Sequence, residues 1–161
     1  MPVWQLGPDR AAEWRTIRLE SLREAPDAFE ERLADWAERP LEDFARRLVS
    51  GRTFAAGDEP GRPLAVAGWV SGLDARDAAR GWVVSVYARP EARGTGLAGA
   101  ALQAVFGDAS ACGMTSLGLN VVASNLPALA LYEGLGFRDS GRTGIVTSRG
   151  APEIEMLRPL P

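Results

Sequence analysis

Apolar residues near the start of the chain recur at the spacing of a helix. Trp14, Ile17 and Leu22 fall on one side of this pattern, because residues three or four positions apart share a face of an α-helix. Asp9 precedes the apolar stripe with a side chain suited to capping a first turn, and Pro26 follows it. We therefore expect a helix that begins after Asp9, as its N-cap, and ends before Pro26.

The rest of the chain alternates between strand-like and helix-like patterns. Short apolar runs bounded by turn residues are typical of strands, whereas longer segments with apolar residues at helical spacing are typical of helices. Strands are predicted at 3–6, 52–56, 64–70, 82–88, 116–122, 145–147 and 154–157, and further helices at 41–49, 95–112 and 125–134.

The order of these elements indicates the class of fold. Strands and helices alternate in the middle of the chain, while strands follow one another more directly nearer its ends. This order predicts an α/β (mixed α+β) protein in which about four helices flank a central mixed sheet. The sequence contains no repeat, low-complexity tract or interdomain linker, so we expect residues 1–161 to form a single domain.

Composition and charge narrow the range of functions. Apolar residues make up 46% of the chain and charged residues 24%, which is ordinary for a globular protein. The net charge of −3 argues against nucleic acid as a partner. The first residues lack the pattern of a signal peptide, and no stretch approaches the roughly 20 apolar residues that span a bilayer. We therefore expect a cytoplasmic protein with no membrane partner.

The chain contains no histidine and a single cysteine, Cys112. These counts exclude a Ser-His-Asp or Cys-His site, a histidine-ligated zinc site and a disulfide framework. We expect no metal site, and we expect Cys112 to be a buried structural thiol. A general base would then have to be a carboxylate, a water molecule, a tyrosine or an unusual amine.

A basic glycine turn joins a predicted strand to a predicted helix. The segment 93–98, Arg-Gly-Thr-Gly-Leu-Ala, follows the apolar run 82–88 and opens the helix pattern of 95–112. Such a turn directs several unpaired backbone N–H groups, and the positive end of a helix dipole, toward one point. The glycines permit torsions and a close approach that a Cβ would prevent. The turn therefore predicts a phosphate-binding site.

A second segment, 125–137, places an asparagine at a helix start and a tyrosine seven positions later on the same face. Together with the glycine turn, it resembles the GNAT superfamily of N-acetyltransferases. The pyrophosphate loop of that family, Arg/Gln-x-x-Gly-x-Gly/Ala, is matched by Arg93, Gly96 and Ala98. Its other signature, Asn-x-x-Ala-x-x-Leu-Tyr-x-x-x-Gly-Phe, is matched by Asn125, Ala128, Leu131, Tyr132, Gly136 and Phe137.

The resemblance implies the GNAT fold, with a mostly antiparallel sheet that splays in the middle, and it implies acetyl-CoA as cosubstrate. In the family, the turn binds the pyrophosphate, a strand edge binds the pantetheine arm, the asparagine assists there, and the tyrosine protonates the departing thiolate. Carried over by position, the cosubstrate-binding residues are Arg93, Gly94, Thr95, Gly96, Leu97 and Ala98 in the turn, Val86, Tyr87 and Ala88 on the strand, and Asn125; the general acid is Tyr132.

The general base is left open. The strand that ends before Asn125 is similar to that of bacterial ribosomal-protein N-terminal acetyltransferases, which carry a base Glu where this chain has Asn120. A water held by Asn120, Ser85 or a backbone carbonyl is one alternative. A carboxylate from elsewhere is the other, with the candidates Glu20, Asp27, Glu30 and Asp74.

The function we expect is acetyl-CoA-dependent transfer of an acetyl group to a primary amine by direct attack on the thioester. Because Asn120 replaces the base Glu, a small-molecule amine is favoured over a peptide N-terminus as the acceptor. A CoA-binding regulatory module with weak catalysis is the third interpretation, and a homodimer is a further expectation from the resemblance. Three tryptophans could form a wall of the acceptor pocket, namely Trp14, Trp36 and Trp82.

Overall fold

The computed structural model describes residues 2–161 and contains one seven-stranded sheet. Neighbouring strands in the order β1-β2-β3-β4-β5-β7-β6 are antiparallel, except for β4 and β5, which are parallel. This is the mixed, mostly antiparallel sheet that was predicted. The strands are β1 (Val3–Gln5), β2 (Arg52–Ala56), β3 (Ala65–Val70), β4 (Arg80–Ala88), β5 (Ser116–Val122), β6 (Arg138–Asp139) and β7 (Glu153–Pro159).

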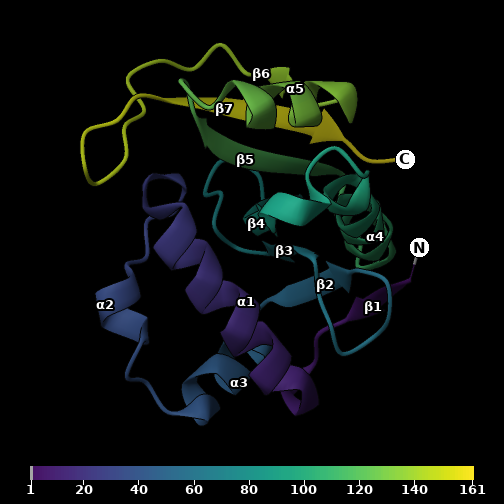
Figure 1. The fold of residues 1–161 in the computed structure, drawn as a ribbon. Coiled ribbons are helices and arrows are strands. Elements are labelled where there is room, and N and C mark those ends of the chain that lie inside the picture. Colours follow the sequence, from purple (N-terminus) through teal and green to yellow (C-terminus); the bar gives the residue numbers. More distant parts are fainter. Residues whose placement is uncertain (1) are drawn as a thin grey trace.

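Five α-helices accompany the sheet (Figure 1). Four of them were predicted. The fifth, α2, is a short helix that no apolar pattern in the sequence predicts. Among residues 2–161, no helix is both long enough and apolar enough to cross a membrane. The helices are α1 (Ala11–Glu24), α2 (Leu33–Trp36), α3 (Leu41–Ser50), α4 (Leu97–Ala111) and α5 (Leu126–Gly134).

The sheet separates two apolar cores. Alternate residues of a strand face opposite sides, so Val66 of β3 packs with α1 and α3, whereas its neighbours Ala65 and Ala67 pack with α4. The core on the α4 side of the sheet also includes Phe137 and Tyr132. In Figure 1, α1, α2 and α3 lie together beside β2–β4, and α5 lies beside β5 and β7 at the other side of the molecule.

Two details of the predicted elements were wrong. Asp9 does not cap α1: it lies inside a 3-10 turn, Pro8–Arg10, which begins because Pro8 fixes its own torsion, and α1 starts only at Ala11. The predicted strand 145–147 is reduced to one bridge between Val146 and Pro152. Left-handed glycines on both sides of it, among them Gly144 with φ of 79°, interrupt the extended chain.

Candidate active site

The sheet opens between its two parallel strands. β4 and β5 pair only at their first residues, where 80–82 lie opposite 116–118. Beyond that point β5 pairs only with β7, through residue Val122, and β4 pairs only with β3. The opening is a cleft of about 1120 Å³ that is lined by 82–88 on one side and by 119–122 on the other. The splay that the resemblance implied is therefore present.

A β-bulge shapes the β4 wall of this cleft. The register with β3 shifts so that Val66 and Gly68 lie opposite Tyr87 and Val84, which leaves one extra residue in β4. Ser85 lies in that stretch with a φ of 58°, a left-handed conformation that is uncommon outside glycine. One extra residue turns the side chains that follow it to the opposite face of the sheet. The Tyr87 side chain therefore packs in the core with α1 and α3.

Backbone groups of β4 beyond the bulge face the cleft. The N–H of Arg89 donates to the carbonyl of Leu64 on the β3 side, at 2.9 Å. Backbone groups alternate in direction along a strand, so the N–H and C=O of Ala88 and Val86 point away from β3 and into the opening. The Tyr87 side chain is bound elsewhere: its hydroxyl donates to Glu20 at 3.1 Å.

The glycine turn ends in a helix start with free donors. Gly94 and Gly96 have φ values of 76° and 85°, and α4 begins directly after them. The Ala100 N–H donates to the Gly96 carbonyl, which is the first helical bond of α4, so the N–H groups of 97–99 have no acceptor within the helix. Those groups and the helix dipole favour an anion at this end of the cleft.

Not every residue of the turn has the same surroundings. Arg93, Gly94, Gly96 and Ala98 line the cleft. The Thr95 N–H and hydroxyl both donate to the Ala92 carbonyl, which holds the turn closed. The Leu97 side chain is 4% exposed and packs in the core beneath α4, so only its backbone N–H can contribute to the anion site.

Asn125 lies at the start of α5, as predicted, and it caps the helix. Its Oδ1 accepts a hydrogen bond from the Ala128 N–H at 3.3 Å. Its amide nitrogen takes no part in that bond, and Asn125 lines the cleft. The capping role and a contact with a ligand are therefore compatible in one side chain.

Tyr132 lies at the cleft with its ring buried. The side chain is 8% exposed, and the ring packs edge-on against Phe137 with centroids 5.8 Å apart. Its hydroxyl has no hydrogen-bond partner among residues 2–161, and no fully buried side-chain polar atom there is left unpaired, so the oxygen reaches the open space of the cleft. Burial raises the pKa of this phenol well above its ordinary value, which keeps it protonated and able to donate.

Two of the four candidate carboxylates are engaged away from the cleft. Glu20 accepts from Arg89 at 2.7 Å as well as from Tyr87, and chiefly the Arg89 hydrogen bond lowers the pKa of Glu20. Asp74 is buried and accepts hydrogen bonds from Arg76 and Arg80, and the Arg76 contact lowers the pKa of Asp74 most. Neither residue lines the cleft, and both carboxylates are poor proton acceptors.

The other two candidates, Asp27 and Glu30, line the cleft together with a carboxylate that sequence reasoning missed, Glu153. Burial, and then the nearby charge of Glu30, raises the pKa of Glu153. Glu153 is the first residue of β7. It lies opposite Val122, the last residue of β5, and β5 ends shortly before Asn125. Only that strand pairing, which no local pattern reveals, brings it to the site.

Asn120 also lines the cleft. Its partner in the β5–β7 register is Glu155, which is 1% exposed. Glu155 accepts hydrogen bonds from Arg76 at 2.8 Å and from Arg142 at 3.2 Å. It is therefore neutralised by arginines, and Asn120 and Ser85 provide only hydrogen-bonding groups.

Two loops meet at one end of the cleft. Glu30 accepts a hydrogen bond from the Ser148 N–H at 3.2 Å. The Arg149 guanidinium donates to the carbonyls of Pro26 and Phe29 and lies 3.8 Å from Asp27. These contacts tie the segment 25–31 to the loop before β7, and both segments contribute residues to the lining of the cleft.

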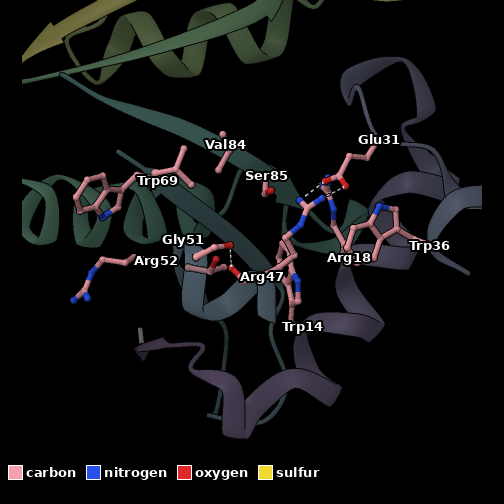
Figure 2. Close-up of a pocket in the computed structure, with 13 residues that line it drawn as sticks. Trp14, Arg18, Glu31, Trp36, Arg47, Gly51, Arg52, Trp69, Val84 and Ser85 are labelled. Atoms are coloured by element: carbon pink, nitrogen blue, oxygen red, sulfur yellow. Dashed lines mark hydrogen bonds and ion pairs between the residues drawn. The ribbon is translucent and has the colours of Figure 1, made fainter. Parts of the chain in front are cut away.

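A cluster of charged and aromatic side chains lies at the junction of the cleft and a smaller cavity of about 80 Å³. Figure 2 shows Glu31 facing the guanidinium groups of Arg18 and Arg47. Glu31 accepts from Arg18 at 3.0 Å and from Arg47 at 2.9 and 3.1 Å. Trp14 and Trp36 line the smaller cavity, and the third expected tryptophan, Trp82, lines the cleft itself.

Cys112 lies outside the site and was placed wrongly by the sequence analysis. It is exposed because α4 ends at Ala111, so Cys112 is the C-cap rather than part of the buried stripe. Among residues 2–161, no group of three or more acidic or cysteine side chains is arranged to hold a metal ion.

The comparisons with known proteins agree with this geometry. The profile of the acetyltransferase (GNAT) family matches residues 12–137, which is more than half of the chain. A comparison with curated protein sequences finds no significant match.

Solved structures of similar fold include several acetyltransferases. An acetyltransferase of the GNAT family from Streptococcus pneumoniae is 19% identical over 99% of both chains, with a TM-score of 0.82. A phosphinothricin acetyltransferase from Sinorhizobium meliloti, in complex with acetyl-CoA, is 23% identical over 99% of this chain and 88% of its own, with a TM-score of 0.78. A ribosomal-protein-alanine N-acetyltransferase from Brucella melitensis is 19% identical over 99% of this chain and 100% of its own, with a TM-score of 0.73.

At these identities the likeness to solved structures concerns the fold. The family follows from the matched profile, whose residues include both the glycine turn and the helix that carries Tyr132. The chain belongs to the acetyltransferase (GNAT) family, whose acetyl donor is acetyl-CoA.

Proposed function

We propose that the protein is an N-acetyltransferase that transfers the acetyl group of acetyl-CoA to the primary amine of a small molecule. The observation that carries this proposal is the cleft between β4 and β5, which joins a turn with free N–H groups to a buried tyrosine, Tyr132. One groove therefore offers an anion site at one end and a proton donor within it.

Acetyl-CoA fits the groups that line the cleft. The N–H groups at the start of α4, with Gly94 and Gly96 allowing close approach, suit a pyrophosphate. The free backbone groups of Val86 and Ala88, continued by the amide of Asn125, suit the amides of a pantetheine arm. In this proposal Arg93 adds charge at the cleft, Thr95 and Leu97 contribute through the shape and N–H groups of the turn, and Tyr87 contributes by its backbone.

The chemistry follows from the positions of three groups. Bound acetyl-CoA supplies a thioester, which the amine attacks so that a C–N bond forms and the C–S bond breaks. A β4 N–H beyond the bulge stabilises the negative charge that develops on the carbonyl oxygen. Tyr132 donates its proton to the departing sulfur and is reprotonated from solvent. Because no covalent enzyme intermediate is needed, positioning supplies much of the rate.

Glu153 is the group we propose as acceptor of the proton that the amine loses. It lines the same cleft, and its pKa is raised by burial and by Glu30. A carboxylate with a raised pKa is a stronger base than an ordinary glutamate. A water held by Asn120 or Ser85 can carry the proton to it, since both residues line the cleft.

The loop contacts favour a small acceptor over a peptide. Glu30 with Ser148, and Arg149 with Phe29, join the two loops at the end of the cleft where an acceptor would lie. A protein N-terminus would need these contacts to open. A small amine needs only the space behind them.

The test is acetyl-CoA-dependent thiol release over a panel of small amines and short peptides. It should be made with Cys112→Ser protein, because the exposed Cys112 thiol reacts with the same reagents. We expect release that depends on small amines and not on peptides. Acetyl-CoA binding without release from any acceptor would replace the proposal with a binding module, and peptide-dependent release would replace the acceptor class.

A further inference from the structure

The wall of the cleft formed by α1 and α3 contains an arginine that the proposed acetyl transfer does not use. Arg18, on α1, has a side chain that is only 8% exposed. Its guanidinium stacks near Trp14 and Phe29, at 5.7 and 4.8 Å from the ring centroids. A charge in such a position is costly unless it is fully paired.

The pairing of Arg18 is incomplete. Within residues 2–161 its guanidinium makes one hydrogen bond, from Nη2 to Glu31 Oε1 at 3.0 Å. No fully buried side-chain polar atom in that range is left unpaired, so Nε and Nη1, which have no partner there, keep some exposure, and Arg18 lines both the cleft and the smaller cavity. An arginine has five N–H donors in a planar fork, so Arg18 keeps donors that Glu31 does not use.

Glu31 cannot neutralise the cluster. Its two carboxylate oxygens are shared between Arg18 and Arg47, and Arg47 alone binds both of them. Two guanidinium groups and one carboxylate leave an excess of one positive charge. The other arginine of the smaller cavity is directed elsewhere: Arg52 binds Asp108, and Figure 2 shows its guanidinium turned away from the cluster.

The cavity behind the cluster has the size of a small polar group. Its volume is about 80 Å³, and one water needs roughly 10–15 Å³ on this measure. A carboxylate on a short stem fits, whereas a peptide chain does not. Ser85, the left-handed residue of the bulge, lines this cavity too, so it adjoins the strand where the thioester carbonyl would lie.

Acidic and basic side chains line different parts of the cleft. Glu30 and Glu153 line it beside the loop before β7, whereas Arg18 and Arg47 line it beside α1 and α3. A molecule with an ammonium and a carboxylate matches this division. Its amine can give a proton to Glu153 while its carboxylate pairs with the arginines.

We infer that the acceptor is a primary amine that also carries a carboxylate, such as an amino acid, and that Arg18, assisted by Arg47, binds this carboxylate. The inference rests on the proposed acetyl transfer and adds the chemical class of its acceptor. The fork of Arg18 matches a carboxylate in a bidentate pair, which gives orientation as well as affinity.

The experiment compares matched acceptors that differ in one group. Each amino acid is assayed beside its primary amide, its decarboxylated amine and its aminophosphonate counterpart, with acetyl-CoA saturating. We expect kcat/KM for the amino acid to exceed that for the amide or amine by roughly 10- to 100-fold, as for loss of a charge-assisted pair. A preference for the amide, the amine or the phosphonate would overturn the carboxylate assignment.

Variants test which residue is responsible. Arg18→Met should raise KM for the amino acid by roughly 10- to 100-fold and leave the neutral amine nearly unchanged, and Arg18→Lys should recover part of the loss. Arg47→Met, at a side chain that is 51% exposed, should give a smaller effect in the same direction. Arg52→Met is the matched control, because its guanidinium binds Asp108, and it should not change the preference.

The two proposals fail in different ways. Acetyl-CoA binding, measured by the change in tryptophan fluorescence, shows whether each variant is folded and whether its cosubstrate site is intact. Turnover of amines with no preference for a carboxylate, or with the same preference in Arg18→Met, overturns the carboxylate site and leaves the acetyl transfer standing. If no acceptor is turned over and N-acetyl amino acids do not raise Tm, both proposals are overturned.

Discussion

Two walls of the cleft, one formed by β4 with the glycine turn and the other by α1 with α3, present different kinds of chemical groups. On the side that we propose for the cosubstrate, β4, the glycine turn and the start of α4 present mainly backbone groups, and these come from one continuous stretch, 82–100. On the side that we propose for the acceptor, α1, α3 and the segment between them present charged side chains, and Arg18, Glu31 and Arg47 come from separate elements. The first wall suits a ligand common to a family, and the second can vary from one member to the next.

The difference shows which residues a family resemblance can carry over. A backbone site needs glycine at fixed positions and a helix start directly after them, so it leaves a compact motif in the sequence. A side-chain site needs only that the fold brings its groups together, so it leaves none. Substitutions on the two walls should therefore separate cosubstrate binding, acid–base chemistry and acceptor choice.

The largest effect is expected for Tyr132→Phe. Loss of the proton donor should lower kcat by roughly 100-fold or more, with no change in acetyl-CoA affinity, because the ring and its contact with Phe137 remain. Steady-state thiol release gives kcat, and calorimetry gives the affinity. Tyr87→Phe is the matched control, since its hydroxyl binds Glu20 away from the cleft. Equal losses in both variants would rule out the acid role.

Glu153→Gln should have the next largest effect, a fall of roughly 10- to 100-fold in kcat/KM. Because the pKa of Glu153 is raised, the wild-type rate should rise with pH through a midpoint above the ordinary range of a glutamate, and the variant should lose this limb. The measurement is kcat/KM from pH 4.5 to 8.

Glu30→Gln is the companion variant for that profile. Removing the neighbouring negative charge makes Glu153 easier to ionise, so the midpoint should move to lower pH while the limb persists. If kcat/KM of Glu153→Gln still rises with pH in the same range, the base is another group.

Gly96→Ala tests the backbone wall. A residue with a Cβ at φ of 85° is strained, so we expect a loss of about 1 kcal/mol in the free energy of unfolding and roughly tenfold weaker acetyl-CoA binding. Gly107→Ala, inside α4 with open space around its Cβ, should instead stabilise the protein by about 0.5–1 kcal/mol. Urea unfolding and calorimetry measure both. Unchanged affinity in Gly96→Ala would remove the turn from the cosubstrate site.

The smallest effect is expected for Glu20→Gln, which touches neither ligand. Its carboxylate joins α1 to Arg89 at the end of β4, so we expect about 1 kcal/mol of destabilisation at pH 7. The folded-state pKa of Glu20 is lowered, so its ionic contribution is present above the unfolded pKa near 4.5 and fades as pH falls below it. Urea unfolding of wild type and variant should therefore converge in acid, and a constant difference would contradict this origin.

Much of the fold could be predicted from the sequence because its elements carry local signals. The apolar stripe of α1, the short apolar runs of the central strands and the cap at Asn125 led to the right elements. Where the local signal was weak, the prediction failed. β6 is the polar pair Arg138–Asp139, and its pairing with β7 could not be inferred from an apolar pattern.

For the candidate site, the sequence by itself predicted that the glycine turn, Asn125 and Tyr132 lie near one another, since each belongs to a motif whose spacing is set within one short unit of the chain. Tertiary structure decided the rest. The left-handed Ser85, the position of Glu153 opposite Val122, the removal of Glu20 and Asp74 from the cleft, and the meeting of Arg18 with Arg47 all depend on pairing between distant segments. The physical reason is that backbone torsions and helix ends are fixed by neighbouring residues, whereas charges are paired by whatever the packed sheet and helices bring within reach.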